Sequence, residues 1–460
     1  SRLKKQTLDP HILKTFRPVS NLSFVSKLIE RVVASQLNKH LMDNNLCEPN
    51  QSAYRPAHST ESALLRVQND ILCAVGSKEA VLFVMLDLSA AFDTVDHTTL
   101  LDKLDQIGVE GKAASWISSY LQHRQQSVSV SGVDSSPEQL TCGVPQGSVL
   151  GPMLFTLYTA SLGRLFRHHG VEYQLYADDT QLWLSFEPKD ISKAIVRMEQ
   201  CIQAVHQWMG HHYLKMNCEK TEYLIIASPP ISKSFNIKSL INIDGQSVIP
   251  SSSAKNLGVL MDSNISLDSH ISSVCRSCYL QIHNLNRIKA FMDHETLERL
   301  IHAFITSKLD YCNSLFLGLP AKTIMRLQRV QNVAARILTS TPRRNHITPV
   351  LYHLHWLPVG QRIKFKVLLT VFKSIHHLGP SYLSDIIHPH TSRCNLRSAS
   401  QSILHVPFTR SSSIQQRTFS HAGPRLWNEL PVHLRAETDI VAFKKQLKTH
   451  LFTLHYEHCF

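Results

Sequence analysis

The apolar and polar positions of this chain repeat with two different periods, and each change of period marks a new element. Residues 80–88 form a continuous apolar run that ends in a carboxylate, which predicts a buried strand. Apolar residues at helical spacing predict helices elsewhere in the first half of the chain. These helices are expected over residues 26–37, 60–75 with Thr60 as the N-cap, 97–106, 112–122, 153–166, and from an Asp190 cap to about Met209.

One acidic turn stands between two segments of β-branched, aromatic and apolar residues. Residues 171–175 and 180–186 are strand-like, and Tyr176-Ala177-Asp178-Asp179 lies at the tip of the hairpin that they predict. Two adjacent carboxylates are costly there if they are buried unpaired, and a divalent cation is the natural compensation. An exposed acidic turn is the alternative for this stretch taken alone.

The other predicted strands are shorter or less regular. Residues 127–131 and 139–144 are expected to pair as a hairpin, and 214–226 as a further strand. Pro229-Pro230 marks a boundary, followed by a small hairpin over 241–248 and 256–261. Helices are then expected over residues 267–290, 295–305 and 322–338, and, after a second boundary at 341–344, over 359–377 and 440–454.

Composition adds a division of charge to this picture. The chain has 460 residues, enough for two or three domains, and 43% of them are hydrophobic. Residues 1–230 hold 21 Lys and Arg against 23 Asp and Glu, whereas residues 231–460 hold 27 against 12. The balance is therefore −2 in the first half and +15 in the second. The candidate carboxylate chemistry lies in a neutral half, and the charge that attracts a polyanion lies in the other.

Cysteine, histidine and apolar runs indicate no further class of site. The ten cysteines are scattered, and the one CxxC, Cys275 with Cys278, falls in a predicted helix, which favours a structural role. The 27 histidines form no recognised metal-binding pattern. No secretory signal is visible, and no apolar run is long enough to cross a bilayer. The chain begins with Ser1, not Met, as a fragment of a longer product would.

Asp87 provides a partner for the acidic hairpin. It follows the apolar strand directly, so three carboxylates converge if that strand and the hairpin are neighbours in one sheet. Carboxylate oxygens are the ligands that Mg²⁺ prefers, and Mg²⁺ leaves positions open for substrate phosphates. A pair of such ions can clamp the attacking and leaving oxygens of a phosphoryl displacement. The pattern therefore predicts a two-metal site at Asp87, Asp178 and Asp179.

At this point the sequence resembles a known family. Four motifs stand in the order of the palm motifs of reverse transcriptases, namely residues 86–95, 143–148, 176–179 and 217–222. Their amino-acid sequences are similar to those of LINE-type enzymes of non-LTR retrotransposons. Further resemblances cover nearly the whole chain. They are residues 16–20 and 51–55 for the fingers, 255–262 for the entry to the thumb, and 346–362 with 423–431 for the C-terminal region of one vertebrate-abundant LINE group.

The resemblance implies an α+β, right-hand polymerase fold with fingers, an antiparallel-sheet palm and a helical thumb, followed by a mostly helical basic tail. The expected domains are residues 1–80 for the fingers, 81–230 for the palm, 231–340 for the palm–thumb hairpin and thumb, and 341–460 for the tail. The implied activity is RNA-directed DNA synthesis. Its implied partners are an RNA template, a DNA primer and dNTPs, with two Mg²⁺ ions, or Mn²⁺, as cofactor.

The same resemblance assigns roles to individual residues. Asp87 and Asp178 correspond to shared metal ligands, and Asp179 to the third, less directly engaged carboxylate. Phe92 stands where the family places an aromatic gate that crowds a ribose 2′-hydroxyl, although core packing is the alternative. The remaining assignments are Gln146 and Gly147, with Ser148, for the loop against the template base and incoming nucleotide, Arg17 and more weakly Arg55 for the triphosphate, and Lys220 for the pyrophosphate leaving group.

The basic half is expected to grip the template–primer backbone through the thumb. Arg326, Arg329 and Arg336 fall on one predicted helix, and a solvated helix face is the alternative for each of them. The family normally carries an upstream endonuclease, which nothing in this chain resembles. Two other functions stay open: a remnant that only binds nucleic acid, and an RNA-templated RNA polymerase, against which Phe92 argues. The implied function is consistent with an intracellular, nuclear location.

Overall fold

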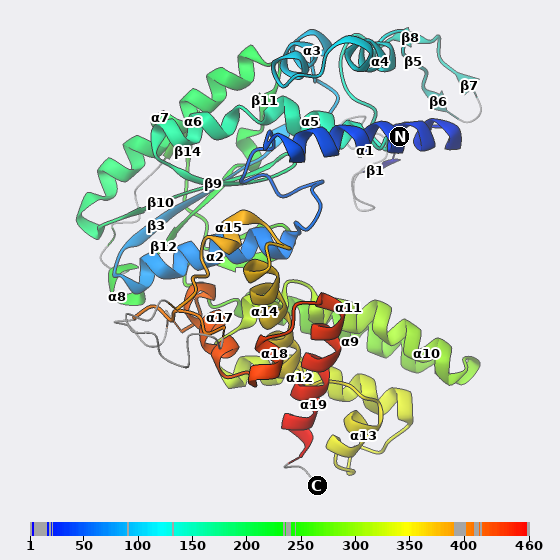
Figure 1. Cartoon of the computed structure of the whole chain (residues 1–460), viewed down its shortest axis with the longest axis vertical. Coiled ribbons are helices and arrows are strands. Elements are labelled where there is room, and N and C mark those ends of the chain that lie inside the picture. The colour runs from blue at the N-terminus through cyan, green and yellow to red at the C-terminus, as the bar shows by residue number, and fades with distance from the viewer. Residues whose placement is uncertain are drawn as a thin grey trace.

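The computed structural model describes most of the chain. The described residues are 2–3, 16–17, 20, 22–89, 92–130, 133–232, 235, 241–243, 245–390, 402–408, 414 and 416–457. They form a mixed helix and sheet structure, in which a sheet-containing upper half stands on a lower half of helices (Figure 1). The predicted α+β fold class is confirmed, with an antiparallel sheet and a helical bundle after it.

Four antiparallel strands form the central sheet in the order β12-β3-β10-β9. β3 (Ala80–Leu86) and β10 (Asp179–Phe186) occupy the middle, with β12 (Glu222–Ile226) and β9 (Glu172–Tyr176) outside them. Side chains of a strand point alternately to opposite faces. In β3 both sets are buried, which explains why its sequence is continuously apolar.

One face of the sheet is covered by helices from the first half of the chain. Leu82, Val84 and Leu182 point into this core, where they meet apolar residues of the covering helices. Helix α7 supplies Met198 and Val205, with a regular apolar face. The helices of this layer are α1 (Phe24–Asp43), α3 (His97–Gln106), α4 (Gly111–Leu121), α5 (Gly151–Thr159), α6 (Leu162–His169) and α7 (Ile191–His211).

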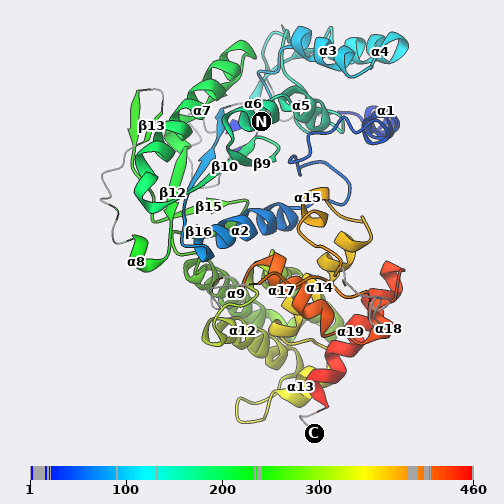
Figure 2. The same ribbon diagram turned by 60° about the vertical axis from the view of Figure 1, so that its left-hand side comes forward.

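The other face rests on α2 (Thr60–Gly76), which lies between the sheet and the helical bundle in both views (Figure 1 and Figure 2). Phe83 and Trp183 point into this second core, and its buried residues continue through the bundle to the last helix. The bundle contains α9 (Asp268–Ile288), α10 (His294–Ile301), α11 (Ser307–Asp310), α12 (Ala321–Thr339), α13 (Thr348–His353), α14 (Val359–Ile375), α15 (Ser381–Ser384), α17 (Phe419–Asn428), α18 (Val432–Arg435) and α19 (Ile440–Tyr456).

The shared second core joins three stretches of sequence. Helix α2 precedes the sheet, α9 to α12 follow it, and α14 to α19 belong to the region after the boundary at 341–344. Phe372, Trp427 and Phe443 pack together at the centre of the last part, and the rings of Phe372 and Phe443 stack with 4.2 Å between their centroids. The described helices of the C-terminal region are therefore packed as part of the bundle.

The remaining strands and short helices lie around these layers. The paired strands are β1 (Arg2–Leu3) with β2 (Phe16–Arg17), β4 (Leu88–Ser89) with β11 (Lys215–Met216), β5 (Gln125–Gln126) with β8 (Glu138–Gln139), β6 (Ser129–Val130) with β7 (Val133–Asp134), β13 (Ile241–Ile243) with β14 (Gln246–Val248), and β15 (Ser253–Asn256) with β16 (Val259–Asp262). Short helical turns occur at α8 (Pro229–Ser232) and at residues 188–190, 218–220, 289–291, 302–306 and 313–316.

Several local predictions were wrong, and each has a physical reason. The N-cap of α2 is Ser59, not Thr60, because Ser59 and Ser62 form a reciprocal capping box. Asp190 does stand at the N-cap position of α7, but its side chain makes no cap hydrogen bond and pairs with Lys193 at 2.7 Å instead. The single helix expected over 153–166 is two helices, and the strand expected over 214–226 is interrupted by a helical turn. The small hairpin expected over 241–261 is two separate hairpins.

The helices of the described residues do not meet the requirements for crossing a membrane. No helix there combines the length and the apolar character that crossing a bilayer requires.

Replacing Phe443 with Ala should destabilise the whole bundle, because the side chain is fully buried against Phe372 and Trp427. We expect a loss of about 3–5 kcal/mol in the free energy of unfolding, measured by urea denaturation. Val441→Ala is the control on the same helix, since Val441 is 71% exposed and should change stability by under about 0.5 kcal/mol. Equal stabilities of the two variants would contradict the shared core.

Candidate active site

The pairing of β3 with β10 brings the predicted carboxylates to one end of the sheet. Thr180 lies opposite Leu86 in the antiparallel register, so the next positions along the two chains are Asp179 and Asp87. Asp179 in turn pairs with Tyr176 across the hairpin, which leaves Ala177 and Asp178 as its two-residue turn. The condition for convergence, that the two strands be neighbours, is therefore met.

The electrostatics of Asp179 reflect this crowding of negative charge. Its side chain retains solvent contact, yet the surrounding protein and the carboxylates of Asp178 and Asp87 raise its pKa to about 6. Burial is the largest cause, and the two like charges add to it. A bound cation would offset both causes, and carboxylates with perturbed pKa values of this kind gather at functional sites.

Asp87 is held by two groups from the loop after β11. Its Oδ2 accepts hydrogen bonds from Lys220 Nζ at 3.1 Å and from Asn217 Nδ2 at 3.2 Å. The Asn217 N–H also donates to the Asp87 carbonyl at 2.9 Å, so the loop is fixed to the strand end by its backbone. The structure therefore brings Lys220 to the carboxylates. Asn217 opens the 217–222 motif and was not selected from the sequence.

The donor set of carboxylate oxygens suits a hard divalent cation. Asp87, Asp178 and Asp179 are the residues that would hold it. In the described part of the chain, however, no three His, Cys, Asp or Glu side chains stand close enough to share one ion in this conformation. Asp87 is engaged by Lys220 instead, so the carboxylates are near neighbours but not a closed ligand cage.

The conformation of the acidic turn depends on a glutamine from the segment before α2. Ala177 has φ +58°, a left-handed conformation that residues with a Cβ rarely adopt, although primed hairpin turns require it. Its N–H donates to Gln51 Oε1 at 3.1 Å, and the same oxygen accepts from the Ala53 N–H at 2.9 Å. Gln51 is buried and was not selected from the sequence, although it opens the 51–55 motif.

The loop of residues 143–148 is fixed by hydrogen bonds beside Phe92. Gln146 Nε2 donates to the Asp93 carboxylate at 2.8 and 2.9 Å. The Val144 N–H donates to the Phe92 carbonyl at 2.8 Å. Gly143 has φ +88°, and a Cβ there would come within 2.8 Å of the Asp93 carbonyl oxygen, so glycine is required. The ring of Phe92 is half-buried and packs on Phe155 with 4.7 Å between centroids.

A buried glutamate connects the first helix to this loop. Glu30 of α1 is 1% exposed, and its carboxylate accepts the N–H groups of Val149 at 2.7 Å and Leu150 at 3.0 Å. These amides stand at the start of α5, where helix N–H groups otherwise lack partners. This role could not be predicted from the sequence, because Glu30 lies in a stretch with the ordinary polarity pattern of a surface helix.

The arginines expected at the triphosphate and on the thumb are placed differently from one another. Arg55 donates through Nη1 to the Glu48 and Gln51 carbonyls at 2.8 and 3.1 Å, which fixes their loop. The side chain of Arg17 lies outside the described residues. On α12, Arg329 is exposed, whereas the other two are engaged locally. Arg326 lies 3.5 Å from Asp268, and Arg336 donates to the Asn345 carbonyl at 2.7 Å.

Comparison with known proteins adds to this geometry. A family model described as reverse transcriptase (RNA-dependent DNA polymerase) matches residues 3–261. The chain is 29% identical over 343 residues to the probable RNA-directed DNA polymerase from transposon BS of Drosophila melanogaster, covering 72% of this chain and 36% of that protein. It is 28% identical over 277 residues to the RNA-directed DNA polymerase from the mobile element jockey of the same organism, covering 59% and 29%.

Among solved structures, a telomerase from Candida tropicalis in complex with a TWJ fragment of telomeric RNA is similar at a TM-score of 0.42 and 10% identity. That match covers 94% of this chain and 57% of the telomerase chain. The chain spans about a third of the length of the curated relatives named above. The family model covers more than half of the chain and the relatives are polymerases of mobile elements, so the LINE-type resemblance is confirmed and the chain belongs to the reverse transcriptase (RNA-dependent DNA polymerase) family.

Proposed function

We propose that this chain is the polymerase part of a LINE-type retrotransposon enzyme, which extends a DNA 3′-hydroxyl with dNTPs on an RNA template. The observation that carries the proposal is the register of β3 and β10, which sets Asp87 opposite Asp179 beside the Asp178 turn. Family membership and the names of the relatives support the same reaction.

Two Mg²⁺ ions, or Mn²⁺ in their place, are the proposed cofactor. When bound, they would lower the pKa of the primer hydroxyl and balance the charge of the triphosphate. Asp87 and Asp178 would hold both ions, and Asp179 would complete the set. Lys220 lies beside Asp87 with its side chain 66% exposed, a position from which its ammonium group could contact the pyrophosphate as it leaves.

Selection and positioning of the nucleotide fall to the loop beside the site. Gln146 is oriented by Asp93, and Gly147 has φ +101°, so the backbone there can approach a base or ribose closely. Phe92 is tied to the same loop through its carbonyl and supported from behind by Phe155. We propose that its ring restricts the space for a 2′-hydroxyl and thereby favours dNTPs.

Template and primer would be held largely by charge. Residues 341–460 hold 15 Lys and Arg against 5 Asp and Glu, so they contribute +10 of the net +13. Arg329 adds an exposed guanidinium on α12. Contacts of this kind bind phosphates without sequence preference and weaken steeply as salt rises.

Asp178→Ala should remove primer extension on poly(rA)/oligo(dT) with Mg²⁺. We expect a loss of more than about 100-fold in rate, since even partners of metal ligands cost 10–100-fold when removed. Asp134→Ala is the matched control, because Asp134 is an exposed hairpin carboxylate outside the site. Unchanged activity of Asp178→Ala at the same Mg²⁺ concentration would refute the mechanism. A wild-type chain that binds template–primer without extending it would favour the binding-only alternative.

The Mg²⁺ requirement should change with pH around the pKa of Asp179, which is about 6. Protonation below this pKa removes a ligand charge, so the Mg²⁺ concentration for half-maximal extension should rise as pH falls from 7.5 to 5.5. The stability of the metal-free chain should change in the other direction, and increase as pH falls. The raised pKa means that the folded chain binds more protons than the unfolded chain between pH 4 and 6, so this group favours folding more as pH falls.

Asp179→Asn is the control for both effects, because the amide does not titrate. Its thermal midpoint without metal should equal or exceed that of the wild type at pH 7.5, and the part of the pH dependence that belongs to Asp179 should disappear. A variant that retains the full wild-type pH dependence of the Mg²⁺ requirement would show that other groups cause it.

Phe92→Val should relax the choice of sugar. Opening space beside the loop is expected to raise the ratio of NTP to dNTP incorporation by about tenfold or more, since one steric contact is worth about 1–3 kcal/mol of discrimination. Phe155→Leu is the control, because Phe155 lies behind Phe92 and is fully buried. An unchanged ratio in Phe92→Val would leave Phe92 as a core residue only.

A further inference from the structure

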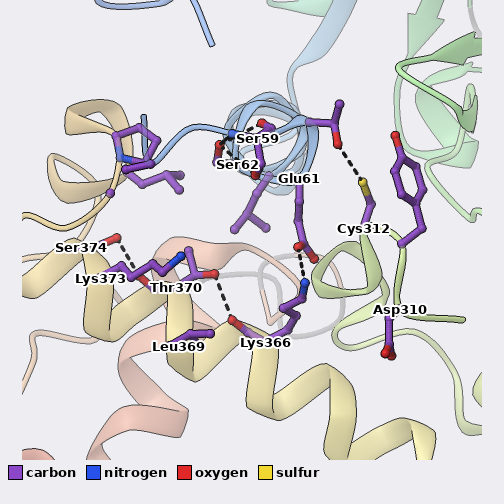
Figure 3. A pocket seen from close by; sticks show the side chains of 17 residues that line it. Ser59, Glu61, Ser62, Asp310, Cys312, Lys366, Leu369, Thr370, Lys373 and Ser374 are labelled. Atoms are coloured by element: carbon purple, nitrogen blue, oxygen red, sulfur yellow. Dashed lines mark hydrogen bonds and ion pairs between the residues drawn. The ribbon is translucent and has the colours of Figure 1, made fainter. Parts of the chain in front are cut away.

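The C-terminal region contacts α2 and the segment before it, which shapes the acidic turn, although this region lies outside the residues matched by the family model. Its helix α14 faces the start of α2 across a pocket of about 370 Å³ (Figure 3). Lys366 of α14 pairs with Glu61 of α2 at 3.0 Å, and Thr60 approaches the Cys312 sulfur at 3.8 Å. The start of α2 is therefore held from the bundle side.

Beside this pocket, Tyr382 of α15 connects α2 to the edge of the sheet. Its hydroxyl lies 2.8 Å from Ser52 Oγ and 3.1 Å from Ser62 Oγ. Ser52 Oγ also accepts from Gln174 Nε2 of β9 at 2.8 Å. Gln174 is 0% exposed, and the three hydroxyl-bearing residues are each under 9% exposed. Water therefore cannot readily take the place of a lost hydrogen-bond partner here.

Ser62 stands at one end of this series of hydrogen bonds, and its own donation determines the direction of the others. Ser62 donates its proton to the Ser59 carbonyl at 2.9 Å, so it can only accept from Tyr382. Tyr382 then donates to Ser62 and must accept from Ser52, while Ser52 accepts from Gln174. The result is one directed chain, from Gln174 through Ser52, Tyr382 and Ser62 to the cap of α2, and removal of one hydroxyl leaves a buried neighbour without its partner.

The same segment that carries Ser52 determines the turn. The Ser52 N–H donates to the Leu175 carbonyl at 3.0 Å, and the Leu175 N–H donates to the Asn50 carbonyl at 2.9 Å, so residues 50–52 extend the sheet beyond β9. Gln51, between them, accepts the N–H of Ala177 in its left-handed conformation. A shift of this segment would therefore move the carboxylates of Asp178 and Asp179.

A second contact links the same elements. The guanidinium of Arg66 in α2 lies 5.5 Å from the ring centroids of both Tyr382 and Trp183 of β10. It also approaches Gln174 Oε1 at 3.5 Å and pairs with Glu172 at 3.3 Å. Tyr382 is thus connected to the sheet through its hydroxyl and through its ring.

We propose that Tyr382 is a positioning residue of the polymerase site: through Ser52 and the 50–53 segment, the C-terminal region holds the Asp178–Asp179 turn in its working conformation. The consequence for the reaction rests on the proposed function, whereas the consequence for the turn does not. The C-terminal region would accordingly be required for full activity and not only for binding of nucleic acid.

The test compares Tyr382→Phe with Tyr456→Phe in the full chain. Both variants lose one hydroxyl from a buried tyrosine of the C-terminal region, but Tyr456 donates to the Trp356 carbonyl at 2.9 Å, away from the sheet. Hydrogen–deuterium exchange of peptides covering residues 50–53 and 172–180 should become about fivefold faster in Tyr382→Phe and stay unchanged in Tyr456→Phe. The Mg²⁺ concentration for half-maximal primer extension should rise about fivefold in Tyr382→Phe alone.

Ser52→Ala separates this role from general destabilisation. It should reproduce both effects of Tyr382→Phe, and the double variant should be no worse than either single variant, because both break one hydrogen-bond chain. Equal exchange in Tyr382→Phe and Tyr456→Phe, or faster exchange spread evenly over the bundle, would overturn the proposal. If the wild type itself does not extend primers, the polymerase proposal fails, and the exchange data still decide whether Tyr382 positions the turn.

Discussion

The antiparallel pairing of β3 with β10 is the constraint on which the rest of this structure depends. It places Asp179 opposite the position of Asp87, where burial and, in addition, the neighbouring carboxylates of Asp178 and Asp87 raise the pKa of Asp179. The pairing persists because both strands are buried on both faces between two apolar cores. The energy that holds the charged end of the sheet together thus comes from the apolar remainder of the same strands.

The two apolar cores group elements that are not neighbours in the sequence. One covers the sheet with helices from the first half of the chain, and the other joins α2 to the bundle and to the C-terminal helices. Three helices of the C-terminal region contact α2, through Lys366 of α14, Tyr382 of α15 and Ser420 of α17. The position of the acidic turn is consequently coupled to residues some 200 positions further along the chain.

Local errors of the sequence prediction share one cause. Thr60 and Asp190 are both good caps by residue type, but the cap of α2 is decided by the exchange between Ser59 and Ser62, and Asp190 is drawn to Lys193. The expected phosphate contacts of Arg55 and Arg336 stay predictions, and in this structure both side chains donate to backbone carbonyls of their own loops. When a side chain has several possible hydrogen-bond or ion-pair partners, only the three-dimensional structure shows which one it contacts.

The sequence by itself determined the fold class, the helices of strong periodicity, and the positions of β3 and β10 to within two residues. It also indicated that three carboxylates lie at the ends of these strands. Each of these features depends on local pattern or on a motif of adjacent residues. The tertiary structure decided which side chains from distant segments contact one another. It placed Lys220 and Asn217 on Asp87, Gln51 under the turn and Glu30 at the start of α5. Contacts between distant segments leave no periodic trace in a sequence, since a single buried polar residue looks the same as an exposed one until its partners are known.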